Sequence, residues 1–100
     1  MATVPVTTQP VVLIGKNKNR VNVILQNTGS TDVFVKKWLY TNPIAPVPSA
    51  TNYDFILTAK PGEGNSESDI YQITSISAFV GVTASKTSTV GASETVKVVL

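Results

Sequence analysis

The feature that most constrains this chain is a succession of short runs rich in Val, Ile and Thr, separated by polar segments rich in Gly, Asn, Ser and Pro. Apolar residues that alternate with polar ones over four to eight positions are typical of strands with one buried face. No segment shows the three- and four-residue apolar spacing of an amphipathic helix. The pattern predicts strands near residues 3–8, 10–15, 20–27, 32–39, 53–60, 69–74, 76–84 and 93–100.

Seven or eight short strands predict an all-β fold, an antiparallel β-sandwich of the immunoglobulin-like or jelly-roll type. The hydrophobic share of 42% is enough for one core, so residues 1–100 are expected to form a single domain. The chain contains no Cys, which excludes disulfides and thiolate metal sites. Its stability must therefore come from packing, hydrogen bonds or oligomerisation.

The best-defined strand spans residues 20–27, where Val21, Val23 and Leu25 share the face expected to be core. The polar connections at 15–19 and 27–32 contain Gly and Asn, which favour tight turns. We therefore expect this strand to form hairpins with both of its neighbours in the sequence. A further Ser/Thr/Gly-rich turn is expected over residues 86–93.

A Pro-rich segment at 41–52 interrupts the strand pattern. Its prolines cannot donate to a central ladder, and they favour extended backbone. One interpretation is a long connection that crosses between the sheets and packs on its own domain. The other is an arm that contacts a partner, and Ile44 and Val47 need apolar surroundings in either case.

Three large apolar residues, Trp38, Leu39 and Tyr40, precede this segment and cannot all face an alternating core. Either the Pro-rich segment or a neighbouring strand covers them, or they contact another subunit or a partner, since Trp and Tyr are favoured interface residues. They could also form an aromatic platform for sugar rings.

Lys16, Lys18 and Arg20 occupy alternate positions, which in extended backbone places them on one side. They predict a small basic patch that could meet an acidic protein surface, although a solvated hairpin edge is the plainer interpretation. The net charge is only +2 and no aromatic residue is interleaved with these three. We therefore do not expect a nucleic-acid partner.

The chain contains neither His nor Cys, so it lacks the commonest general base and the most nucleophilic side chain. We expect no enzyme, no catalytic residue, no metal and no cofactor. Glu63, Glu67 and Asp69 could hold calcium on one Gly/Ser-rich loop, but their spacing does not match an EF-hand. A solvated acidic loop is the favoured interpretation.

The first residues lack the basic start and apolar core of a secretory signal, and no apolar run approaches the roughly 20 residues that span a bilayer. We therefore expect a soluble protein made in the cytoplasm, without a membrane partner.

From Arg20 to Val35 the chain has a strand that begins with Arg and ends in Ile-Leu-Gln-Asn, a Gly/Ser turn, and a return strand that begins Val-Phe-Val. This stretch resembles the β-hairpin signature of small virion proteins of tailed bacteriophages, of the capsid decoration, cement or head-fibre type. Pro61-Gly62 and residues 70–73 continue the similarity, which covers roughly residues 10–80.

The resemblance implies a non-enzymatic structural protein on the capsid surface of a virion, made in the host cytoplasm. Its partner would be the major capsid protein, which it reinforces or decorates, and it would be a homo-oligomer, with a trimer favoured. Arg20 and Asn27 would be structural, with Asn27 capping the turn, while the loops and the 41–52 arm dock. The alternative is a carbohydrate- or surface-binding module in which Trp38, Tyr40 and Tyr53 stack on sugars.

Overall fold

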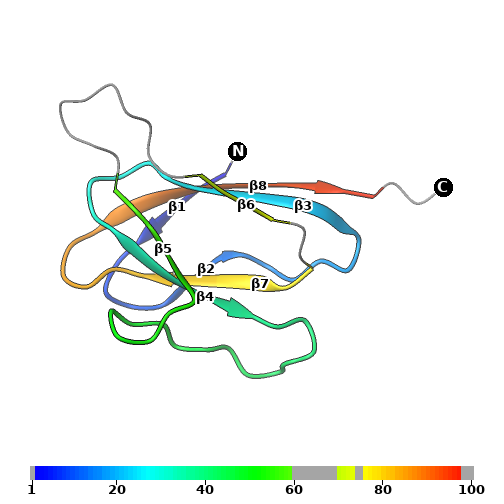
Figure 1. The fold of residues 1–100 in the computed structure, drawn as a ribbon, viewed down its shortest axis with the longest axis horizontal. Helices are drawn as coiled ribbons and strands as arrows, with labels where there is room; N and C mark the ends of the chain where they lie inside the picture. The colour runs from blue at the N-terminus through cyan, green and yellow to red at the C-terminus, as the bar shows by residue number, and fades with distance from the viewer. Residues whose placement is uncertain (1, 60–69, 74–75, 98–100) are drawn as a thin grey trace.

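The computed structural model describes residues 2–59, 70–73 and 76–97, which form strands and connections without a helix (Figure 1). The expectation of an all-β chain is confirmed. The strands within these ranges are β1 (Ala2–Val6), β2 (Val11–Ile14), β3 (Arg20–Asn27), β4 (Val33–Trp38), β5 (Phe55–Leu57), β6 (Ile70–Ile73), β7 (Ala78–Val82) and β8 (Ser88–Val96).

The strands form two antiparallel sheets, ordered β1-β8-β3-β6 and β2-β7-β4-β5 (Figure 1). Both sheets contribute buried apolar side chains to one cluster, which makes the arrangement sandwich-like. The members of this cluster are Val6, Leu13, Val23, Leu25, Val33, Val35, Leu57, Phe79, Val90 and Ala92.

The predicted faces of β3 need one correction. Val23 and Leu25 are buried as expected, but Val21 is 48% exposed and Arg20 only 5%. The register between β3 and β8 shifts between Arg20 and Asn22, so Val21 is the extra residue of a β-bulge. Because side chains alternate along a strand, the bulge turns Arg20 inward and Val21 outward.

Neither predicted hairpin forms. β2 and β3 lie in different sheets, as do β3 and β4, so both connections cross the sandwich. The polar side chains do bend the chain locally, since Asn17 Oδ1 accepts from the Asn19 N–H at 3.0 Å and Asn27 Oδ1 from the Gly29 N–H at 2.9 Å. No residue in the described ranges has the positive φ that the two-residue hairpin turns require. The Asn side chains thus bend the chain on both sides of β3, but they do not determine which strand pairs with β3.

The last strand begins at Ser88 rather than near residue 93, which corrects the turn predicted over 86–93. Residues 88–92 pair with β1, and residues 90–96 pair with β3. The hydroxyl of Ser88 donates to Asn27 Oδ1 at 2.8 Å, so its polarity is satisfied inside the fold. This bond explains how a Ser/Thr/Gly-rich stretch starts a central strand. The predicted residues 98–100 lie outside the described ranges.

β7 is buried along its whole length, on both faces. Its Phe79 belongs to the core, while the side chains on the opposite face are small. Phe34, Lys36 and Trp38 of β4 lie opposite those small residues in the ladder and are themselves half-buried. Large side chains of β4 thus cover the outer face of β7, and Trp38 lies at the end of this row.

Candidate protein-contact site

The Pro-rich segment, residues 41–52 and called the arm below, belongs to the loop between β4 and β5. These two strands pair in the same sheet, so the arm does not cross between sheets. It leaves the end of β4 and returns past Asp54, whose N–H donates to the Val35 carbonyl at 2.8 Å. In Figure 1 the arm is the green loop that extends below β4. The expected sheet-crossing connection is wrong, and the segment is a long hairpin loop.

One end of the arm is anchored at the main-chain carbonyl of Asn42. This oxygen accepts from the Trp38 indole Nε1 at 2.7 Å and from Lys16 Nζ at 2.5 Å. The ammonium of Lys16 also lies 4.2 Å from the centroid of the Trp38 ring, a cation–π contact. Asn42 Oδ1 accepts from the Ile44 N–H at 3.0 Å, which fixes the start of the arm.

The other end of the arm contains a small internal bridge and is followed by a ring contact that ties it to β4. Ser49 and Asn52 exchange two main-chain hydrogen bonds, of 2.9 and 3.2 Å, and the preceding Pro48 is buried. Tyr53 then packs against Phe34 with ring centroids 5.3 Å apart. Both ends are thus tied to the domain.

Between these anchors the two large apolar side chains, Ile44 and Val47, face solvent. Nine large apolar side chains are exposed in the described part of the chain, and five of them lie between residues 39 and 53, which concentrates exposed apolar area on this loop. Ile44 is 74% exposed and Val47 67%. We call these five residues the contact surface: Leu39, Tyr40, Ile44, Val47 and Tyr53.

Trp38 differs from its neighbours Leu39 and Tyr40. It is half-buried and bonded to the arm, while the next two residues are exposed. The interpretation in which the Pro-rich segment helps to cover this run therefore holds for the indole alone. Leu39 and Tyr40 stay exposed to solvent in the part of the chain that the structure describes.

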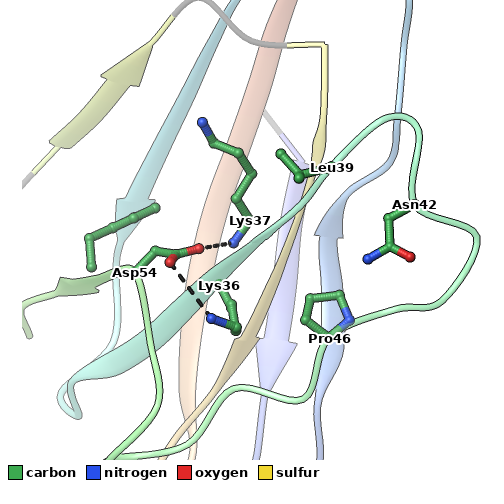
Figure 2. A pocket seen from close by; sticks show the side chains of 7 residues that line it. Lys36, Lys37, Leu39, Asn42, Pro46 and Asp54 are labelled. Atoms are coloured by element: carbon green, nitrogen blue, oxygen red, sulfur yellow. Dashed lines mark hydrogen bonds and ion pairs between the residues drawn. The ribbon is translucent and has the colours of Figure 1, made fainter.

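A pocket of about 650 Å³ lies between β4, the arm and the start of β5 (Figure 2). Lys36, Lys37, Leu39, Asn42, Pro46, Asp54 and Phe55 line it. Asp54 joins the β5 side of the pocket to β4: its carboxylate accepts from the Lys37 N–H at 2.7 Å and lies 3.7 Å from Lys36 Nζ. Sequence reasoning missed this pocket, since no local pattern shows that Asp54 returns beside the pair Lys36-Lys37.

The predicted basic patch does not form, because Arg20 is buried. Its Nε lies 2.6 Å from Glu94 Oε2, and its Nη1 donates to the Ser77 carbonyl at 2.6 Å. Its Nη2 donates to the Gly15 carbonyl. Arg20 therefore joins the 15–19 connection to β8 and to Ser77, the residue before β7, and its assignment as a protein contact is wrong. Of the other two, Lys18 is exposed and Lys16 holds the arm.

Asn27 has the structural role that the resemblance implied. Its Nδ2 donates to the Thr31 carbonyl at 2.8 Å and to the Leu57 carbonyl at 2.9 Å. Its Oδ1 accepts from the Gly29 N–H and the Ser88 hydroxyl, at 2.9 and 2.8 Å. One fully buried amide thus caps the 28–32 turn and joins β3, β5 and β8.

Two features are absent from residues 2–59, 70–73 and 76–97, a cluster of metal-ligand side chains and a membrane-spanning helix. These ranges hold no group of three or more His, Cys, Asp or Glu side chains placed to share a metal ion. They also hold no helix with the length and apolarity needed to span a bilayer. The acidic loop with Glu63, Glu67 and Asp69 lies outside the described residues.

Comparison of the chain with protein-family models, with curated proteins and with solved structures finds no match. The candidate site is therefore defined by geometry alone. It consists of the contact surface, the anchors at Asn42 and Tyr53, and the pocket beside Asp54.

Proposed function

We propose that the two sheets form a jelly roll. The support is the nested pairing, in which β1 pairs with β8, β2 with β7, β3 with β6 and β4 with β5. The chain can thus be described as one long hairpin with the β4–β5 loop, which contains the arm, at its tip. Additional pairing of β3 with β8 and of β4 with β7 divides this hairpin into two sheets. In an immunoglobulin fold the first two strands pair within one sheet, whereas here β1 and β2 lie in different sheets.

For the function, we propose a non-enzymatic structural protein that binds a viral capsid surface and reinforces or decorates it, with the major capsid protein as partner. The observation that carries the proposal is the contact surface, whose most exposed residues, Ile44 and Val47, lie on an arm tied to the domain at both ends. Jelly rolls are frequent among capsid proteins, and the Arg20–Val35 stretch resembles phage virion proteins. A fold alone does not assign a function, so the exposed apolar loop is the stronger support.

The anchored arm suits docking because it is ordered before the partner arrives. A loop held in its bound shape loses less conformational freedom on association, which leaves more of the apolar contact energy for affinity. Full burial of Ile44 and Val47 contributes roughly 1.5–3 kcal/mol for each side chain. The resemblance also favours a homotrimer, and several arms per particle would raise avidity.

Co-sedimentation with purified capsids that lack this protein tests the proposal. The double variant Ile44→Ser/Val47→Ser should bind at least about 100-fold more weakly, because the two side chains together contribute about 3 kcal/mol or more, and each 1.4 kcal/mol is about tenfold in affinity. Val21→Ser is the matched control, since Val21 is also exposed and apolar but lies on the other sheet. A wild-type protein that stays monomeric in light scattering and does not bind capsids would exclude the proposed function.

A carbohydrate-binding module is the alternative, because lectins also include jelly rolls and the pocket combines polar and apolar groups. The aromatic platform is less open than expected. Lys16 lies over Trp38, and Tyr53 packs against Phe34, so Tyr40 is the ring without such a contact in the described residues. Glycan-array binding that is lost in Trp38→Ala, with fold and assembly intact, would favour this alternative.

A further inference from the structure

The pocket lies where β4 extends beyond its neighbour β5. β5 pairs with β4 only as far as Val35, so in the described part of the chain no strand lies beside the rest of that edge. Asp54 bonds to this edge through its N–H and its carboxylate, at Val35 and Lys37 respectively. Asn42 and Pro46 of the arm form the opposite wall, as Figure 2 shows.

The charges that line the pocket do not cancel. Two lysines and one carboxylate line it, and only Lys36 pairs with that carboxylate, with its ammonium 3.7 Å from Asp54. Lys37 takes part in no ion pair within the described residues, and its ammonium end points away from Asp54 in Figure 2. Lys37 is therefore a cation beside the pocket that an anionic group can reach.

The remaining walls are apolar. Leu39 is exposed, Pro46 and Phe55 are half-buried, and Phe55 is held edge-on against Phe79 with centroids 6.0 Å apart. The volume of about 650 Å³ admits more than one side chain. The pocket therefore suits a group that joins a carboxylate to an apolar body.

We infer that this pocket receives an acidic segment of the protein partner, with a carboxylate at Lys37 and a neighbouring apolar side chain against Leu39, Pro46 and Phe55. This inference rests on the proposed function, because it specifies the chemistry of the partner that docks there. The contact surface supplies apolar area, and the pocket selects for charge, since electrostatic complementarity mainly sets specificity.

Titration of the ¹⁵N-labelled protein with N-acetyl-aspartyl-leucinamide, followed by NMR, tests the inference. The amide signals of Lys37, Leu39 and Phe55 should shift. The uncharged analogue N-acetyl-asparaginyl-leucinamide should bind about fivefold more weakly, the factor expected for one partly exposed ion pair. Lys37→Gln should abolish this preference and Lys37→Arg should retain it, while Lys18→Gln controls for the loss of one exposed positive charge.

Equal binding of the two dipeptides, shifts that map elsewhere, or an unchanged preference in Lys37→Gln would overturn the inference. Tighter binding of free hexanoate than of the aspartyl dipeptide would also overturn it, because the pocket would then select a small acid. Capsid binding separates the two proposals. If Ile44→Ser/Val47→Ser releases the protein from capsids and Lys37→Gln does not, docking stands and the pocket assignment fails. If the dipeptide binds as expected and capsids do not, the pocket chemistry stands and the proposed function fails.

Discussion

Replacing Asn27 with Ala removes four hydrogen bonds from the centre of the fold. The Leu57 carbonyl and the Ser88 hydroxyl are buried, and each costs about 1–3 kcal/mol when it is left without a partner. The groups at Thr31 and Gly29 are partly buried, so we assign them about 0.5 kcal/mol each. We therefore expect the free energy of unfolding to fall by about 3–7 kcal/mol, a large part of the roughly 5–15 kcal/mol that stabilises a whole domain.

Urea denaturation followed by the fluorescence of Trp38, the sole tryptophan, measures this loss. Asn19→Ala is the matched control because Asn19 is exposed, and it should change stability by less than about 0.5 kcal/mol. Asn27→Asp at neutral pH should destabilise at least as much as Asn27→Ala, because an oxygen would then face two carbonyls. A loss below about 1.5 kcal/mol in Asn27→Ala would refute the assigned role of the amide.

Substitutions at Gly29, Glu94 and Lys16 test three other contacts of the fold and the arm. Gly29→Ala should cost about 2 kcal/mol or more in urea denaturation, because the new Cβ would overlap the Ser88 hydroxyl, whereas Gly15→Ala meets nothing within 4 Å and should be nearly neutral. Glu94→Gln should lower the free energy of unfolding by about 1–3 kcal/mol, because it removes the charge that faces the buried Arg20 guanidinium. The loss should be smaller than for a fully buried ion pair, since the Glu94 side chain is 31% exposed. An unchanged stability would show that the guanidinium does not need this carboxylate. Lys16→Gln should shift the tryptophan emission and speed proteolytic cleavage within 41–52, since the arm loses one anchor; unchanged cleavage would contradict the anchoring.

Most strands could be predicted from the sequence because their apolar residues recur in short local runs; the start of β8, at Ser88, is the exception. The prediction for β3 matched its ends, and that for β4 was one residue too long at each end. Its core side chains Val23 and Leu25 were also predicted, because the spacing of apolar residues within one strand is visible in the sequence. The polar turns were placed correctly on both sides of β3 as well.

Pairing could not be predicted, because it depends on partners distant in the sequence. Whether β3 pairs with β4 or with β8 follows from the whole sandwich, and a Gly/Asn turn is compatible with either. The inward turn of Arg20 follows from one extra residue at Val21, which no local pattern reveals. Ser88 was assigned to a turn because its acceptor, Asn27, lies 61 positions away.

In the candidate site, too, local features were visible in the sequence and contacts between distant residues were not. The Pro-rich sequence left open whether Ile44 and Val47 lie against their own domain or against a partner, and in the structure both are exposed. The anchor at Asn42 and the pocket beside Asp54 depend on where the arm lies against β4. Local sequence contains no signal for these contacts.

Photo-crosslinking from the arm tests the central claim, that this loop contacts the capsid, most directly. A benzophenone amino acid in place of Val47 should form a covalent adduct with the major capsid protein on decorated particles, because this side chain is 67% exposed on the contact surface. The same group in place of Ser85, exposed in the connection between β7 and β8, should give no adduct. Crosslinking from position 85 but not from position 47, or from neither on particles that carry the protein, would contradict the account.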